Sequence, residues 1–181
     1  MVSTAFRLSR RTTSGRSFRR AHSNVRLRGE GLASRSTTIR SEPLVDVPYE
    51  QVAAYDQQVF GIDREPFIRT WISQPGSAGF ATLDAGEVTG YGLLRPCRDG
   101  YKVGPLFANG SERAEVLLDD LLGCARGAPV YIDVPTTNRG AVGIAEKRRL
   151  VPVFQTARMY RGPSPPLDAK RVFGVTSLEL G

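Results

Sequence analysis

The stretch from Tyr101 to Pro135 reads YKVGPLFANGSERAEVLLDDLLGCARGAPVYIDVP and predicts a strand, a helix and a second strand. Its middle part repeats apolar residues at the spacing of one helix face: Ala114, Leu117, Leu118, Leu121, Leu122 and Ala125. Asn109 or Ser111 supplies the helix cap. The run 129–135 is short and almost continuously apolar, which is typical of a strand buried inside a sheet.

The flanking sequence extends this pattern in both directions. A short β-type run at 37–40 precedes a helix over 49–60, which ends at Gly61, and a second helix after Asp63. Glycine-containing turns then separate strands over 79–83, 88–94 and 101–106. After the quoted stretch, the pattern predicts a shorter helix over 136–148 and two last strands over 151–160 and 171–180. This order predicts an α/β fold whose mixed, mostly antiparallel central sheet is flanked by helices.

The net charge of +7 invites a nucleic-acid partner, but its location argues against one. Residues 1–40 contain ten Arg and a single acid, a charge of +9, so the remainder carries −2. We predict that residues 1–35 are a disordered Arg/Ser-rich leader or tail and that 36–181 form a single domain. Three interpretations of the leader stay open: a mitochondrial transit peptide, a solvated tail, or a stretch outside the functional protein. The expected location is the cytoplasm, or the mitochondrion if the leader is a transit peptide.

The composition also excludes several kinds of site. No stretch approaches the ~18 consecutive apolar residues of a membrane span, and the start lacks the apolar core of a secretory signal. Cys97 and Cys124 stand in unrelated contexts, so neither a zinc site nor a disulfide framework is indicated. The single histidine, His22, lies in the leader, which excludes a histidine triad and a multi-histidine metal site from the body. We expect no metal.

The predicted order of elements, taken together with the strand and helix residues quoted above, resembles that of the GNAT superfamily of acyl-CoA-dependent N-acyltransferases. Ile39-Arg40 is similar to the family's first strand, and Tyr55-Asp56-x-x-Val59-Phe60-Gly61 followed by Arg64 is similar to its first helix. The run 156–163, with Phe173-Gly174-Val175, resembles the second domain of bacterial two-domain GNAT proteins. The resemblance covers residues 37–181.

The resemblance implies acetyl-CoA, or another acyl-CoA, as co-substrate. In the family its pantetheine arm lies between two splayed strands, and its pyrophosphate rests on amide groups at the start of the next helix. The implied cofactor contacts are Val103, Gly104, Leu106, Asn109, Gly110, Ser111, Arg113 and Asn138. The loop departs from the family pattern because it has one glycine and is followed by Glu112 and Glu115. For Asn138, the alternative role is a helix cap.

The proton chemistry departs from the family as well. Ala145 stands where the family's tyrosine protonates the departing thiolate. Tyr160 as acid and Asp133 as base are the candidate catalytic replacements, and Arg158 and Tyr91 are candidate substrate contacts. Strand alternation places Arg158 and Tyr160 on one face. Packing, a surface ion pair or a strand-end cap are the alternative roles of these residues.

The resulting hypothesis is an acyltransferase that moves an acetyl or other acyl group from acyl-CoA directly to an amine of a small molecule or protein. The alternative is a catalytically degenerate GNAT-like domain that binds a ligand or a partner protein. We expect no membrane association and no nucleic-acid partner for the body, and a homodimer stays open.

Overall fold

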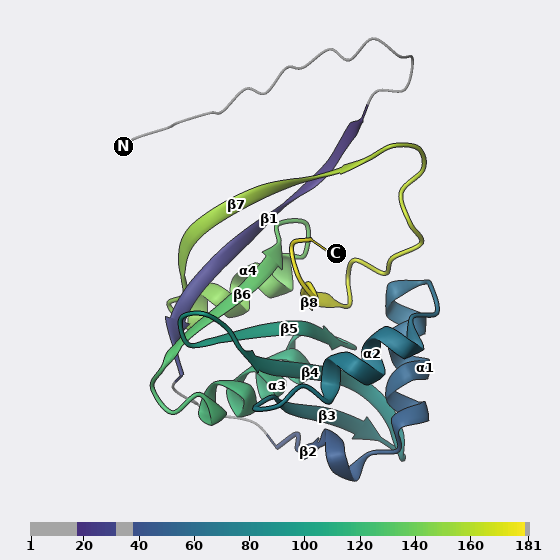
Figure 1. Cartoon of the computed structure of the whole chain (residues 1–181), viewed down its shortest axis with the longest axis vertical. Coiled ribbons are helices and arrows are strands. Elements are labelled where there is room, and N and C mark those ends of the chain that lie inside the picture. The colour runs from purple at the N-terminus through teal and green to yellow at the C-terminus, as the bar shows by residue number, and fades with distance from the viewer. Residues whose placement is uncertain (1–17, 32–37, 180–181) are drawn as a thin grey trace.

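One mixed sheet organises residues 18–31 and 38–179, which are the residues that the computed structural model describes (Figure 1). Its strand order is β2-β3-β4-β5-β6-β1-β7, and β8 pairs with β5 off this path. The strands are β1 (Arg19–Glu30), β2 (Ser41–Pro43), β3 (Ala78–Asp84), β4 (Glu87–Pro96), β5 (Tyr101–Ala108), β6 (Pro129–Pro135), β7 (Val151–Tyr160) and β8 (Val172–Gly174). Among them only β5 and β6 pair in parallel, so the predicted mostly antiparallel α/β fold is confirmed.

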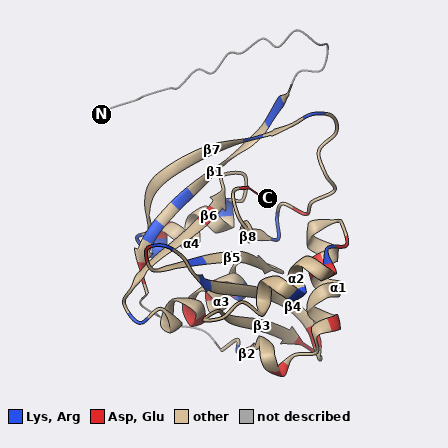
Figure 2. Cartoon of the chain, in the orientation of Figure 1, with Lys and Arg blue, Asp and Glu red and all other residues tan. Residues whose placement is uncertain are grey.

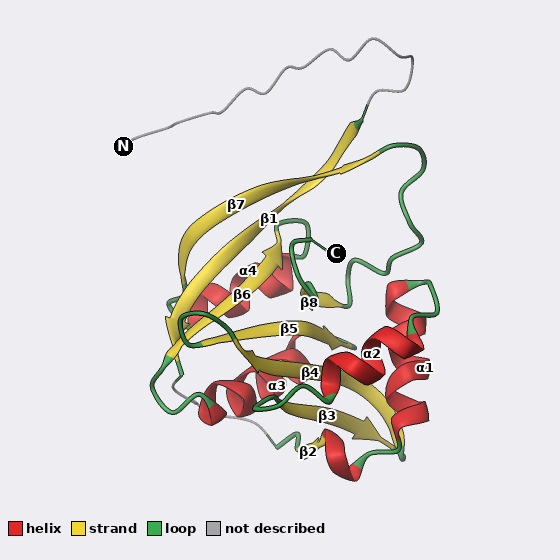
Figure 3. Ribbon diagram, viewed as in Figure 1, coloured by secondary structure: helices red, strands yellow, loops and turns green. Residues whose placement is uncertain are grey.

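Within the described residues, four α-helices flank the sheet (Figure 3). They are α1 (Tyr49–Phe60), α2 (Glu65–Ile72), α3 (Ser111–Cys124) and α4 (Arg139–Lys147), and a 3-10 turn, η1, covers Leu44–Asp46. α1 matches the predicted helix. It ends at Gly61 because this residue adopts a left-handed conformation (φ 80°) that a residue with a side chain rarely takes. None of these helices is long and apolar enough to cross a membrane.

The sheet separates two apolar cores. The apolar stripe of α3 packs with Leu106 and α4 on one side, whereas Val52 and Val59 of α1 pack with Tyr91 and Phe107 on the other. Leu106 and Phe107 are neighbours in β5 and fall into different cores because successive strand side chains point to opposite faces. Both side chains are 1% exposed, so each contributes about 1.5–3 kcal/mol of apolar burial.

The prediction that residues 1–35 are disordered is wrong for Arg19–Glu30. This segment forms β1, which pairs antiparallel with β6 on one side and with β7 on the other. Ser23, Asn24 and Leu27 are buried, and several basic residues lie along the strand itself (Figure 2). Residues 1–17 and 32–35 of the proposed leader lie outside the described part of the chain. A boundary at residue 36 would separate β1 from its own sheet.

A buried ion cluster ties β1 to the middle of the sheet. Asp133 on β6 is fully buried and accepts hydrogen bonds from Arg26 Nε at 2.7 Å and from Arg26 Nη2 at 3.0 Å. Its other contact is an ion pair with the Lys102 ammonium of β5. Three neighbouring strands are therefore joined through one carboxylate. The predicted role of Asp133 as a catalytic base is corrected to a structural one, because both of its oxygens are held by cations.

Replacing this carboxylate is expected to destabilise the fold. Asp133→Asn keeps the shape of the side chain but leaves Arg26 and Lys102 without their counter-charge, which should lower the free energy of unfolding by about 3 kcal/mol. Urea denaturation measures the change. Glu65→Gln is the matched control, because Glu65 pairs with Arg69 on the exposed face of α2, where solvent screens the pair and its loss should leave the unfolding midpoint almost unchanged. Equal losses in the two variants would contradict the structural role.

Candidate functional site

The sheet opens between β5 and β6, as the resemblance implies. Their parallel pairing covers only Tyr101–Val103 against Val130–Ile132. Two residues further along β5, Pro105 has no N–H to donate. β8 enters beyond this point and pairs with β5 through Leu106 opposite Gly174 and Phe107 opposite Val172. The gap is therefore filled by a later segment of the same chain.

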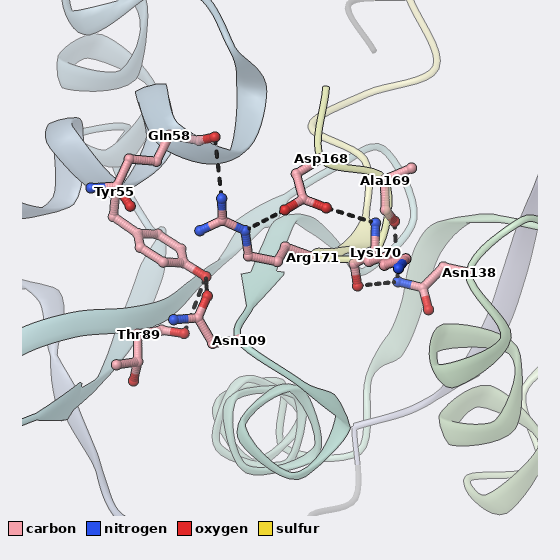
Figure 4. A network of polar contacts seen from close by, with 9 residues as sticks. All are labelled: Tyr55, Gln58, Thr89, Asn109, Asn138, Asp168, Ala169, Lys170 and Arg171. Atoms are coloured by element: carbon pink, nitrogen blue, oxygen red, sulfur yellow. Dashed lines mark hydrogen bonds and ion pairs between the residues drawn. The ribbon is translucent and has the colours of Figure 1, made fainter. Parts of the chain in front are cut away.

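Polar contacts hold this segment in place (Figure 4). Asn138 Nδ2 donates to the carbonyl oxygens of Lys170 at 3.1 Å and Val172 at 2.8 Å. Arg171 donates to the Asp168 carboxylate at 2.9 Å and to the Gln58 carbonyl at 3.4 Å. The segment is thereby attached both to the start of α4 and to α1.

Asn138 also caps α4. Its Oδ1 accepts a hydrogen bond from the Ala141 N–H at 3.1 Å, which confirms the alternative role that the sequence left open. Since Nδ2 and Oδ1 both contact the chain itself, the cofactor contact implied for Asn138 stays a prediction.

The other implied cofactor contacts divide into two groups. Val103, Gly104 and Leu106 are buried in β5, and the carbonyl of Gly104 accepts from Trp71 Nε1 at 3.1 Å. An ideal Cβ on Gly104 would lie 2.4 Å from the Val175 carbonyl oxygen, so the strand and the inserted segment are in close contact.

Asn109, Gly110 and Ser111 form the second group, at the exposed start of α3. The free N–H groups of a helix start favour anions, which keeps this turn available for a phosphate. Arg113 donates instead to Thr89 Oγ1 at 3.1 Å and pairs with Asp84 at 3.3 Å. Its guanidinium is engaged with β3 and β4.

A cavity of about 220 Å³ lies beside the inserted segment. It is formed by the ends of β1 and β7, the end of α1 and the β7–β8 loop, and its lining residues are His22, Asn24, Phe60, Ile62, Arg158, Tyr160, Pro165, Leu167 and Val175. Arg158 and Tyr160 share a half-buried face of β7, as the alternation predicts, and Arg158 Nε donates to the Tyr160 hydroxyl at 3.3 Å. Within the described residues, no carboxylate pairs with Arg158.

His22 is the site residue that the sequence did not predict. It lies opposite Arg158 in the β1–β7 pairing and lines the cavity, so the assignment of His22 to a leader outside the folded body is wrong. Burial lowers the pKa of the imidazole, the positive charge of Arg158 lowers this pKa further, and the Asn24 side chain opposes the shift. The imidazole is therefore neutral at neutral pH and able to accept a proton. Only the placement of β1 could have revealed it.

Tyr91 does not reach the cavity. It is fully buried, and its hydroxyl donates to Asp56, which Arg64 holds through hydrogen bonds of 2.7 and 2.8 Å. Burial, followed by the charge of Asp56, raises the pKa of Tyr91. The predicted substrate contact is therefore corrected to a core position.

The chain is similar to known proteins in both sequence and structure. Residues 52–174 match the family model described as an acetyltransferase (GNAT) domain. The chain is 31% identical over 133 residues to holothin acyltransferase of Pseudoalteromonas sp. (strain SANK 73390), a match that covers 73% of this chain and 45% of that protein.

Solved structures show the same fold at low sequence identity. A candidate acetyltransferase from Pyrococcus horikoshii matches with a TM-score of 0.71 and 20% identity, over 88% of this chain and 52% of that one. A GCN5-related N-acetyltransferase from Sphaerobacter thermophilus matches with a TM-score of 0.56 and 14% identity, over 81% and 54%. The chain spans about half the length of these relatives.

The position of His22 predicts a pH-dependent stability. Its folded-state pKa lies below the value of 6.5 in the unfolded chain, so the unfolded chain takes up the proton first as the pH falls. The free energy of unfolding should therefore decrease from pH 7.5 to pH 5.5, and urea midpoints at these pH values measure the change. Because the chain has one histidine, His22→Gln should remove most of this dependence. An equal decrease in wild type and variant would contradict the assignment.

Proposed function

The chain belongs to the GNAT acetyltransferase family, and on this premise we propose that the protein transfers an acyl group from acyl-CoA to an amine. Acetyl-CoA is the proposed donor, the amine of a small molecule or protein is the proposed acceptor, and the cytoplasm is the proposed location. The observation that carries the proposal is the cavity, since it brings together a neutral imidazole, a phenol and an arginine beside the opening of the sheet.

These three groups fit the proton transfers of the reaction. The attacking amine must lose a proton, and the thiolate that leaves the thioester must gain one. In the proposed scheme the His22 imidazole accepts the amine proton and the Tyr160 hydroxyl donates one to the thiolate. Because Arg158 Nε–H donates to the Tyr160 oxygen, the phenolic proton stays free to be donated elsewhere. Acyl-CoA supplies the reacting carbonyl.

One observation favours the second candidate function, a ligand- or partner-binding module without catalysis. Val172–Gly174 occupies the gap in which the pantetheine arm lies in the family, and Asn138 holds it there. While this segment is in place, the gap cannot receive the arm. Catalysis therefore requires either displacement of the segment or an approach of acyl-CoA along another surface.

Turnover separates the two functions. With acetyl-CoA and a panel of primary amines, wild type should release thiol, and Tyr160→Phe should lower kcat about 100-fold because the general acid is lost. Tyr131→Phe is the matched control, since the Tyr131 hydroxyl contacts Asp99 outside the cavity. Absence of thiol release from wild type would favour the binding module, whereas an unchanged kcat in Tyr160→Phe would reject Tyr160 as the acid.

The inserted segment can be loosened by a single substitution. Gly104→Ala places a methyl group 2.4 Å from the Val175 carbonyl oxygen, so the segment must move. Trypsin cleavage after Lys170 and Arg171 should then be about tenfold faster, because local opening exposes these bonds more often. Gly143→Ala on α4 is the control, because its methyl group meets nothing within 4 Å. If loosening the segment also strengthens acetyl-CoA binding, the segment competes with the cofactor; equal cleavage in both variants would contradict the close packing.

A further inference from the structure

A second cavity, of about 310 Å³, lies at the start of β5. Its volume is at the lower end of the range of about 300–1,000 Å³ that is typical of small-molecule sites. Four of its lining residues are cations, and the full lining is Arg26, Arg95, Cys97, Arg98, Asp99, Lys102, Tyr131 and Glu179. We call this space the Arg95 cavity.

The Arg95 cavity lies on the face of the sheet that points away from α3. Leu94 and Val103 belong to the core that packs on α3. The neighbouring Arg95 and Lys102 therefore point to the opposite face, and they lie opposite each other in the β4–β5 pairing. α3 begins beyond the far end of β5, about 20 Å along the strand from Lys102. The cavity is thus separate from the turn Asn109–Ser111, at which the resemblance implies a phosphate of the cofactor.

Two of the four cations are neutralised within the protein. Lys102 and Arg26 share the buried Asp133 carboxylate. The exposed Glu179 supplies a second negative charge. A hydrogen bond from the Ser177 side chain lowers the pKa of Glu179, and the positive charges of the same two cations lower it further. This half of the cavity needs no charge from a ligand.

The other two cations, Arg95 and Arg98, have no carboxylate partner within the described residues. Arg95 is half-buried, and its guanidinium carbon lies 4.7 Å from the centre of the Trp71 ring. Its Nε is enclosed, so the two Nη groups are the ones that a ligand would contact. Asp99 contacts neither arginine and accepts a hydrogen bond from the Tyr131 hydroxyl at 2.8 Å. Both guanidinium groups are therefore open to an anion.

The charges of the lining favour an anion with several oxygens. Together with the carboxylate behind the wall, four cations face three carboxylates, so positive charge is in excess. A phosphate monoester carries about −1.5 to −2 charges near neutral pH and three acceptor oxygens, which is enough for two arginines. A carboxylate has one charge and two oxygens, which is enough for one. A cavity of this volume also holds a small organic group beside the phosphate.

We propose that the Arg95 cavity binds a small phosphorylated molecule, with its phosphate on Arg95 and Arg98. This site goes beyond the proposed function and does not rest on it, because the Arg95 cavity and the cavity that holds His22 and Tyr160 share no lining residue.

Calorimetric titration of the full chain at low ionic strength, without acyl-CoA, tests the proposal with three probes. Glycerol 3-phosphate carries the phosphate, glycerate carries one carboxylate and no phosphate, and glycerol carries no charge. We expect glycerol 3-phosphate to bind at least about tenfold more tightly than glycerate, and glycerol not to bind up to about 10 mM. No saturable binding of glycerol 3-phosphate up to about 10 mM, or equal affinity for glycerate, overturns the proposal.

Arginine variants locate the phosphate. Arg95→Gln and Arg98→Gln should each weaken glycerol 3-phosphate at least about fivefold, because each removes a charge-assisted hydrogen bond. Since Arg98 is exposed, its variant keeps the test decisive even if loss of the contact with Trp71 unfolds Arg95→Gln. Arg139→Gln is the matched control, because Arg139 is an exposed residue at the start of α4, whose core lies on the other side of the sheet. Equal weakening by Arg98→Gln and Arg139→Gln overturns the site.

Cys97 provides a local readout in the wild-type protein. It is half-buried and lines the Arg95 cavity, whereas Cys124 lies on α3. Saturating glycerol 3-phosphate should slow the alkylation of Cys97 by iodoacetamide at least about threefold and leave that of Cys124 unchanged. An unprotected Cys97 overturns the placement. Competition between acetyl-CoA and glycerol 3-phosphate would make the cavity part of the cofactor site and would also overturn it, whereas absent acyl transfer would reject the proposed function alone.

Discussion

The early end of the pairing between β5 and β6 sets the architecture of the site. The parallel pairing with β6 ends at Val103, and β8 takes the place beside Leu106 and Phe107. The sheet therefore opens at its centre, where an unfilled gap would leave buried backbone groups without partners. Val172–Gly174 fills the gap, and Trp71 takes up the carbonyl of Gly104. The inserted segment and its attachment at Asn138 both depend on this interruption.

Much of the fold can be predicted from local patterns. The stripe of α3 and the glycine after α1 predict those helices because both signals lie within the helix or directly next to it in sequence. The strands of the meander are separated by turns whose glycines adopt positive φ, at Gly86 and Gly100. Alternation along β7 predicts that Arg158 and Tyr160 share one face, and both side chains line the cavity.

The place of β1 and its part of the cavity could not be predicted from the sequence, because they depend on contacts between distant segments. β1 has the composition of a disordered leader, and only its pairing with β6 and β7 makes it a strand. Its arginines look solvated until Arg26 meets Asp133, which is 107 residues away in the chain. For the same reason His22 was placed outside the fold. Tyr91 was misassigned because its burial is set by Asp56 on α1.

The place of β1 in the sheet also has a consequence for how the protein is made. Residues 19–30 leave the ribosome long before β6 and β7, yet β1 finally lies between these two strands. Its pairing with β6 must wait until Pro135 has been synthesised and its pairing with β7 until Tyr160 has been, and such long-range pairing slows folding because a large loop has to close first. Between these two points the outer edge of β1 has no neighbour, and an open strand edge is a template for association with other chains. Synthesis therefore passes through a stage in which the growing chain is most prone to aggregate just before its sheet is complete.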